Sequence, residues 1–314
     1  MKRLAALSSI VLLVVFGTAV AFAQTHSTFS IAAWTDKGEC TRPPTFDTTL
    51  NGMPTKVDKQ LSPSSDQIIL IVFDLTGDLS RVDEAKQAVI SQISKLPSNS
   101  WVGILRSQDG LHVLTDPTPN HQKAVDIIQS LSSNGTPGLL ETVRPALTLA
   151  DAMILKSPVR VSVLYITDGS IYSYRENYTD PVINPSDKHD LSRRFRDVLV
   201  NEKISKLERH ISSLEAPLFV VALNYRQNGL DLAYQNGLDS LAQSTGGETV
   251  VCRSMSEIPQ AISQIFWRVS NAWRLVLAVP PKIHNNLEVG LKASCGDNGL
   301  QLSWRPRFRP KKGE

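Results

Sequence analysis

Short, continuous apolar runs alternate along this chain with longer segments in which apolar residues recur every three or four positions. The runs Ile68–Phe73 and Val159–Ile166 are typical of parallel strands that are covered on both faces. Further strands are predicted at Trp101–Leu105, Leu111–Leu114, Leu218–Leu223 and Thr249–Val251, and helices at Arg81–Leu96, His121–Leu131, Leu139–Leu155, Leu191–Leu214, Leu230–Ser244 and Ile258–Val269. This alternation predicts an α/β fold with a doubly wound, mostly parallel sheet.

Segments of a different character flank the α/β part, which we place at residues 65–272. Residues 24–64 are polar and rich in Thr, Ser and Pro, with a hairpin signal at Asn51-Gly52. After residue 272 the segments WRLVLAVPP, NLEVGLKAS and LQLSW predict antiparallel strands. We therefore expect a small β appendage, built from the N-terminal extension and a C-terminal β tail at 273–304, and then a basic tail at 305–314.

The first 23 residues have the pattern of a cleaved secretory signal peptide. Lys2 and Arg3 precede an apolar run that ends in the small-x-small triplet AFA. About 20 apolar residues can also span a bilayer, so an uncleaved anchor is the alternative. We favour cleavage, which predicts a secreted protein, or one of the periplasm or cell envelope, without a membrane span.

Charge argues against nucleic acid as a partner. The formal net charge is +3, from 33 basic and 30 acidic residues. The leader holds two of the basic residues, and the last ten residues hold five basic residues and one acidic residue. The remaining body therefore carries 26 basic and 29 acidic residues. A body with this acidic excess is not a nucleic-acid binder by charge, and we interpret the basic tail as a solvated, frayed end.

Three cysteines allow at most one internal disulfide, as suits an exported protein. Cys252 lies in the apolar stretch ETVVC and is a candidate buried free thiol. We favour the pair Cys40–Cys295, since both lie outside the alternating region, although spacing leaves the connectivity open.

Oxygen-bearing side chains follow the two most apolar strands. Asp74 ends the first run, and Asp168 follows the second. Because open α/β sheets bind ligands beyond the carboxyl ends of their strands, where strand order reverses, we expect the two carboxylates to meet. Thr76 shares a face of the chain with Asp74, and Gly77 permits a turn that brings Asp78 back to the same point.

Thr136, in a separate Gly-Pro loop, is predicted to lie over the same point. Carboxylates and hydroxyls without His or Cys form a hard-oxygen site. Such a site suits Mg²⁺, with Mn²⁺ and Ca²⁺ as alternatives, rather than zinc or copper.

The order of these residues resembles a von Willebrand factor type A (VWFA) domain with its metal-ion-dependent adhesion site, closest to secreted bacterial VWFA-related proteins. The family pattern is Asp-x-Ser-x-Ser after the first strand, a later Thr, and an Asp after the fourth strand. The matching positions here are Asp74, Thr76, Asp78, Thr136 and Asp168. The segments VLYITDGS and LDSLAQSTGGETV and the β tail add to the resemblance, which covers Ser65–Ser294. It implies a Rossmann-like fold and a cation bound directly by the Thr76 hydroxyl and through water by Asp74 and Asp168.

The sequence departs from the family pattern at Asp78, which stands where a second Ser is usual. A third carboxylate predicts tighter cation binding and a weaker attraction for an acidic partner. Alternatively, Asp78 points away and the site is degenerate. Arg81, one turn further on, is a candidate internal counter-charge that could replace the metal, because the three carboxylates would otherwise repel one another.

The segment after Asp168 is rich in residues favoured at protein interfaces. It carries a candidate partner-binding rim, whose members are Tyr172, Tyr174, Arg175 and Tyr178. The alternative is a surface flap whose tyrosines pack on the domain itself.

We therefore predict a non-catalytic, adhesion-type module that binds a protein or a cell-envelope ligand at this site. The chain contains no G-x-S-x-G or Walker-type motif, which argues against an enzyme. Two rival hypotheses are a metal-free envelope scaffolding protein and a metal-dependent hydrolase. The sequence does not indicate the oligomeric state.

Overall fold

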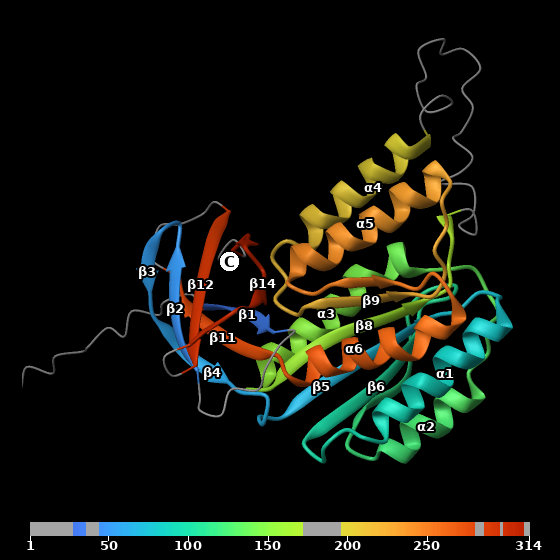
Figure 1. Cartoon of the computed structure of the whole chain (residues 1–314), viewed down its shortest axis with the longest axis horizontal. Helices are drawn as coiled ribbons and strands as arrows, with labels where there is room; N and C mark the ends of the chain where they lie inside the picture. Colours follow the sequence, from blue (N-terminus) through green and yellow to red (C-terminus); the bar gives the residue numbers. More distant parts are fainter. Residues whose placement is uncertain (1–27, 36–43, 172–195, 280–285, 296–297, 311–314) are drawn as a thin grey trace, which may run out of the picture.

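Six strands form the sheet at the centre of the α/β part of the chain (Figure 1). The computed structural model describes residues 28–35, 44–171, 196–279, 286–295 and 298–310. The six strands are β5 (Gln67–Asp74), β6 (Ser100–Arg106), β7 (His112–Thr118), β8 (Arg160–Thr167), β9 (Leu218–Ala222) and β10 (Thr249–Val251). They lie in the order β10-β9-β8-β5-β6-β7, and β7 is antiparallel to its neighbour. The predicted doubly wound, mostly parallel sheet is confirmed.

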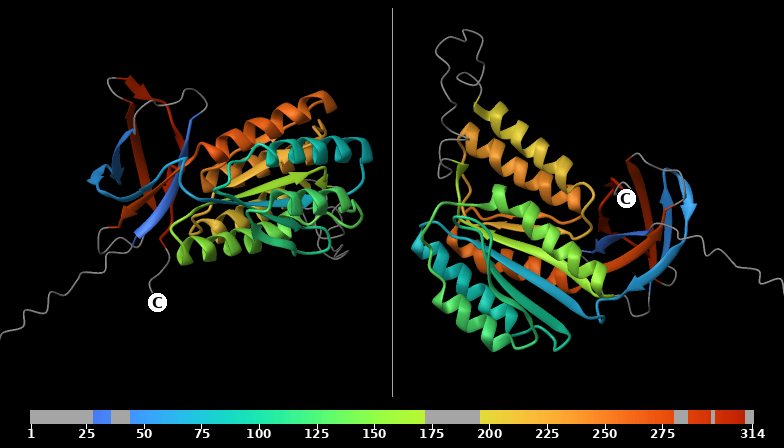
Figure 2. Two further views of the ribbon diagram at one scale, coloured as in Figure 1. Left: turned by 90° about the horizontal axis from the view of Figure 1, so that it is seen from below. Right: turned by 180° about the vertical axis from the view of Figure 1, so that it is seen from behind.

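Helices cover both faces of this sheet (Figures 1 and 2). They are α1 (Leu79–Ile93), α2 (His121–Ser130), α3 (Leu139–Lys156), α4 (Arg196–Ile211), α5 (Gly229–Thr245) and α6 (Ile258–Ser270), with a short 3-10 helix, η3 (Met255–Glu257). Successive residues of β5 point to opposite faces. Ile69 and Ile71 therefore join a core with α1, α2 and α6, whereas Leu70 and Val72 join a second core with α3, α4 and α5.

The strand order reverses at β5. The next strand along the chain, β6, lies on one side of β5, whereas β8 lies on the other, and both pairings are parallel. In the register of β5 and β8, Asp74 stands opposite Thr167. The carboxyl ends of these strands thus form the pole at which such sheets bind ligands.

A β appendage packs at one end of the α/β part. Its first sheet has the order β14-β1-β11-β4, and its second has the order β13-β12-β2-β3, with β15 also paired to β12. The strands are β1 (Thr28–Trp34), β2 (Thr45–Leu50), β3 (Met53–Thr55), β4 (Val57–Leu61), β11 (Trp273–Ala278), β12 (Leu287–Cys295), β13 (Asn298–Leu300), β14 (Ser303–Trp304) and β15 (Arg307–Phe308). Asn51 and Gly52, with φ of 50° and 78°, form the turn between β2 and β3, as the dipeptide favours. Early and late strands therefore share one core.

The start of the basic tail is not the solvated end that its charge predicted. Arg305 is 1% exposed and donates hydrogen bonds to the carbonyls of Ser212 and Leu214, just beyond α4, and to the carbonyl of Arg307. Burial lowers the pKa of Arg305 to about 10. Its charge predicted solvent exposure, but main-chain carbonyls accept the hydrogen bonds of this guanidinium in place of water. Residues 311–314 lie outside the described part.

The cysteines differ in environment. Cys252 is a buried free thiol, as predicted, and burial raises its pKa to about 11. Cys295 is disulfide-bonded. Its predicted partner, Cys40, and the predicted signal peptide at 1–23 lie outside the described residues. None of the helices in the described part combines the length and the apolar character needed to cross a membrane.

Candidate functional site

The carboxylate of Asp168 is enclosed by the turn that follows β5. Its Oδ1 accepts hydrogen bonds from the Thr76 N–H at 2.6 Å and the Thr76 hydroxyl at 3.0 Å. Its Oδ2 accepts from the N–H groups of Gly77 at 3.0 Å and Asp78 at 3.1 Å. A carboxylate has about four acceptor positions, so this turn uses all of them. The structure thus brings together Asp168 and the 74–78 segment, which are about 90 residues apart in the chain.

Asp74 lies directly behind this turn and is fully buried. Its carboxylate accepts from the Ser107 hydroxyl at 2.6 Å, the Gly138 N–H at 2.8 Å and the Thr167 hydroxyl at 2.9 Å. Burial raises the pKa of the Asp74 carboxyl, and the like charge of Asp168 raises it further. The three hydrogen bonds act in the opposite direction, because they favour the ionised form.

Asp78 directs its carboxylate to α1. It accepts from the Ser80 hydroxyl at 2.7 Å and the Arg81 N–H at 3.4 Å, and it pairs with Arg81 Nε at 3.1 Å. These contacts make it the N-cap of α1. The Ser80 hydrogen bond, followed by those of Arg81, lowers the pKa of this exposed carboxyl. Arg81 also donates to the carbonyl of Leu223, so the predicted counter-charge is present.

Thr136 lies at the same pole. Its N–H donates to the Asp109 carboxylate at 3.2 Å, and its carbonyl accepts from the Asp109 N–H at 3.2 Å. Two residues further on, Gly138 binds Asp74. A Cβ atom on Gly169 would lie 3.3 Å from Pro137, so this loop also packs against the residue after Asp168.

Gly77 does not have the role that its sequence position suggested. Its φ lies outside the left-handed region, and a Cβ atom there would meet nothing within 4 Å. The turn is instead held by hydrogen bonds to Asp168. Gly138 is the position that requires glycine, since a Cβ atom there would lie 1.9 Å from the Ser107 carbonyl oxygen.

Several residues at this pole were missed from the sequence. Ser107 and Gln108 follow β6 as Asp74 ends β5, and Gln108 donates to the carbonyl of Leu75 at 2.5 Å. Polar residues at a strand end were the signal that could have found them. Leu79, the first residue of α1, is 64% exposed, and Tyr225, on the loop after β9, is 36% exposed. Arg81 connects α1 to that loop through its hydrogen bond to the Leu223 carbonyl.

The predicted rim residues Tyr172, Tyr174, Arg175 and Tyr178 lie outside the described residues. Of the five predicted metal ligands, Asp78 is directed to α1. Asp74 and Asp168 provide two carboxylates, and the Thr76 hydroxyl oxygen keeps its lone pairs when its proton is donated to Asp168. No cluster of three or more His, Cys, Asp or Glu residues suited to a metal occurs in the described part. The oxygens available to a hard cation at this pole are those of Thr76, Asp74 and Asp168, which are ligand types that such a cation accepts.

Residues 59–170 match the family model described as the von Willebrand factor type A domain. The matched residues run from the end of β4 to just beyond β8 and so cover the first half of the α/β part. The match includes Asp74, Thr76, Asp78, Thr136 and Asp168, and it agrees with the resemblance identified from the sequence.

Solved structures with a similar fold share little sequence with this chain. They include the PilB minor pilin from Streptococcus sanguinis, as a D319A mutant, with 13% identity, coverage of 66% of this chain and 62% of that chain, and a TM-score of 0.46. A von Willebrand factor type A protein from Catenulispora acidiphila has 10% identity, coverage of 92% and 75%, and a TM-score of 0.47. The vWF domain of the type V pili tip protein Mfa5 from Porphyromonas gingivalis has 10% identity, coverage of 65% and 94%, and a TM-score of 0.43. The chain thus spans less than two thirds of the pilin chain. No curated protein matches it significantly.

Proposed function

We propose that this protein is a non-catalytic binding module of the cell envelope or the extracellular space, and that it recognises a protein or surface ligand at the pole formed by β5 and β8. The observation that carries this proposal is the closure of the 76–78 turn around Asp168. It fixes the start of α1, where Leu79 is exposed beside the loop that carries Tyr225. An exposed apolar side chain at a fixed helix start and an exposed Tyr on an adjoining loop are features of interface anchors.

The same hydrogen bonds support a non-catalytic role. A general base needs a free lone pair directed at the proton that it removes. The acceptor positions of Asp168 are occupied by the turn, and Asp74 is buried beneath it.

A divalent cation, most simply Mg²⁺, is part of this proposal. The Thr76 hydroxyl would be its direct ligand, and Asp74 and Asp168 would supply negative charge from behind. When bound, such an ion would stabilise the pole and offer positive charge to an acidic group of the partner.

A metal-free module is the second candidate, and one observation favours it. Arg81 pairs with Asp78 at 3.1 Å and also holds the Leu223 carbonyl. This guanidinium joins the start of α1 to the loop after β9 without a cation. In this form the partner would contact Leu79 and Tyr225 without a metal.

Thermal unfolding with Mg²⁺, Mn²⁺, Ca²⁺ or EDTA separates the two candidates. An ion that binds only the folded state at 100 times its Kd adds about 2.7 kcal/mol to the free energy of unfolding. The cation form predicts a rise in Tm that Thr76→Ala abolishes. Thr148→Ala is the matched control, since Thr148 is exposed on α3 and bonds only within that helix. An unchanged Tm at millimolar metal concentrations would contradict the cation form and support the metal-free module.

Recognition itself is tested by affinity capture from envelope extract, with and without EDTA. Leu79→Ser and Tyr225→Ala should each lower the recovery of a specific partner. Leu155→Ser is the matched control, because Leu155 is 72% exposed near the other end of α3. Recovery that is equal for all three variants would contradict binding at this pole.

A further inference from the structure

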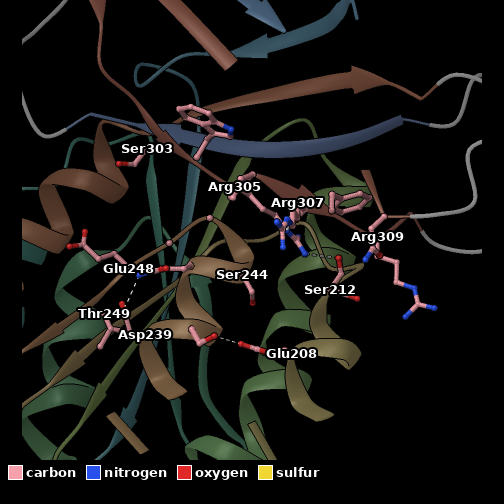
Figure 3. Close-up of a pocket in the computed structure, with 18 of the residues that line it drawn as sticks. Glu208, Ser212, Asp239, Ser244, Glu248, Thr249, Ser303, Arg305, Arg307 and Arg309 are labelled. Carbon is pink, nitrogen blue, oxygen red and sulfur yellow. Dashed lines mark hydrogen bonds between the residues drawn. The ribbon is translucent and has the colours of Figure 1, made fainter. Parts of the chain in front are cut away.

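Figure 3 shows a cavity of about 880 Å³. It lies where β9 and β10 begin, whereas Asp74 and Asp168 lie where β5 and β8 end. Gly247 and Thr249 line it where β10 begins, and Gly247 packs against Leu218, the first residue of β9. The cavity is thus bounded by the ends of α4 and α5 on one side and by residues 302–309 on the other. Its volume is within the range of about 300–1,000 Å³ that is usual for ligand sites, which often lie between structural units.

The frame of this cavity is held in place by buried hydrogen bonds. Arg305 ties the C-terminal segment to the carbonyls of Ser212 and Leu214. The indole of Trp34 donates to the carbonyl of Gly246 at 3.0 Å. Both walls are therefore fixed before any ligand arrives, which lowers the entropic cost of binding.

One wall, formed by α4 and α5, presents carboxylates and hydroxyls (Figure 3), together with the amide of Gln243. The Gln243 amide donates to Asp239 at 2.8 Å, and Ser240 donates to Glu208. These contacts orient planar side chains that keep further acceptors and donors free.

The other wall combines an aromatic side chain with cations. Trp304 is partly exposed, and its indole N–H is held by the carbonyl of Val289 at 2.9 Å, which fixes the orientation of the ring. Arg307 and Arg309 are exposed beside it. A rigid aromatic ring of this kind can offer a large apolar face at little entropic cost.

Charges of both signs line the cavity, and this distinguishes among ligand classes. The carboxylates of Glu208 and Asp239 face a space that also contains Arg307 and Arg309. A strongly anionic or cationic ligand would meet like charge on one wall, which costs binding energy. A neutral ligand rich in hydroxyl groups could instead pair with donors and acceptors on both walls while an apolar face of it stacks on Trp304.

We propose that this cavity is a second binding site, separate from the pole of Asp168, and that it binds a neutral oligosaccharide. Sugar rings present hydroxyls at their edges and C–H groups on their faces. The edges match the amides and carboxylates on α4 and α5, and the faces match the Trp304 indole. The site gives the full-length protein a means of holding a surface glycan independently of its protein partner.

The test is binding of the full-length protein to an immobilised panel of neutral oligosaccharides, with α-linked and β-linked glucose and N-acetylglucosamine oligomers as probes. Polygalacturonate and heparin fragments serve as anionic probes. We expect saturable binding of a neutral probe that Gln243→Ala and Trp304→Ala each weaken by about tenfold, the loss typical of an interface anchor. Trp304→Phe keeps an aromatic face and should retain most of the affinity.

Gln122→Ala is the matched control for Gln243→Ala. Gln122 donates to Asp126 on α2 at 2.8 Å with the same four-residue spacing, and neither residue lines the cavity. Oligosaccharide binding should also persist in EDTA and in the Thr76→Ala variant. The result is therefore independent of whether a cation or a partner binds at the Asp168 pole. The absence of saturable binding to every neutral probe would overturn the proposal. So would binding restricted to the anionic probes, or binding that Gln243→Ala and Trp304→Ala leave unchanged.

Discussion

The Thr76 N–H and hydroxyl both donate to one oxygen of Asp168, at 2.6 Å and 3.0 Å. This relationship joins the end of β5 to the end of β8 through a side chain rather than through the sheet. It makes Asp168 a structural element of the pole, whether or not a cation binds there.

Asp168→Asn should therefore destabilise the protein. An amide nitrogen would face two of the four donors that the carboxylate now satisfies, and partly buried donors that lose their acceptor destabilise the fold. We expect the free energy of unfolding to fall by about 2–4 kcal/mol in urea titrations. Asp116→Asn, at an exposed position on β7, should change it by less than about 0.5 kcal/mol. Equal effects of the two substitutions would contradict the role assigned to Asp168.

Asp74 should make stability depend on pH in a direction opposite to that of a salt-bridged acid. Because its pKa in the folded state is raised above the ordinary value of 3.8, the folded state holds the proton more tightly. The resulting stabilisation is fully present below pH 3.8 and is lost as the pH rises through the raised pKa.

The measurement compares wild type with Asp74→Asn, which does not titrate, in urea at several pH values from 4 to 8. A difference of one in pKa between the folded and unfolded states corresponds to about 1.4 kcal/mol. The wild type should lose stability relative to Asp74→Asn as the pH rises. A gain over that range would mean that the three hydrogen bonds outweigh burial.

Gly138→Ala and Gly77→Ala form a matched pair within the same site. The first places a Cβ atom 1.9 Å from a backbone carbonyl oxygen, whereas the second meets open space. Gly138→Ala should cost about 1–3 kcal/mol, because backbone must shift to admit the methyl group. It should also separate the 135–138 loop from Asp74, which faster hydrogen exchange of the N–H at position 138 would detect. Gly77→Ala should leave both the stability and the exchange near wild type.

Arg305→Ala should release the C-terminal segment from the α/β part. It leaves buried carbonyls after α4 without their donor, and we expect a loss of about 3 kcal/mol. Limited proteolysis should then cut within residues 303–310. Arg307→Ala removes an exposed guanidinium two residues away and should change neither readout. Resistance to cleavage in Arg305→Ala would show that β14 and β15 hold the segment without this anchor.

The sequence predicted the strands and helices of the α/β part because the burial of apolar side chains sets the spacing of apolar residues in each element. The continuous apolar runs became β5 and β8, and the helical periodicity of Val82, Ala85 and Val89 became the buried face of α1. The meeting of Asp74 with Asp168 followed from the rule that parallel strands end at one edge.

What the sequence could not show was the choice of hydrogen-bond partner. Ser107 and the Gly138 N–H reach Asp74 through tertiary packing that no local pattern encodes. The charge of Arg305 predicts a solvated side chain. Its actual acceptor, the Leu214 carbonyl, lies 91 residues earlier in the chain, so no local pattern indicates it. Asp78 fits either a metal ligand or a helix cap by residue type, and only its contacts with Ser80 and Arg81 show the cap.

The pairing of β1 with β11 places Thr28 opposite Ala278. During translation, β1 therefore leaves the ribosome long before its partner β11, and the α/β part lies entirely between them. Contacts that distant in the chain form slowly. The α/β part can thus fold before the appendage closes, and β1 completes its sheet only once that folding has brought it to β11.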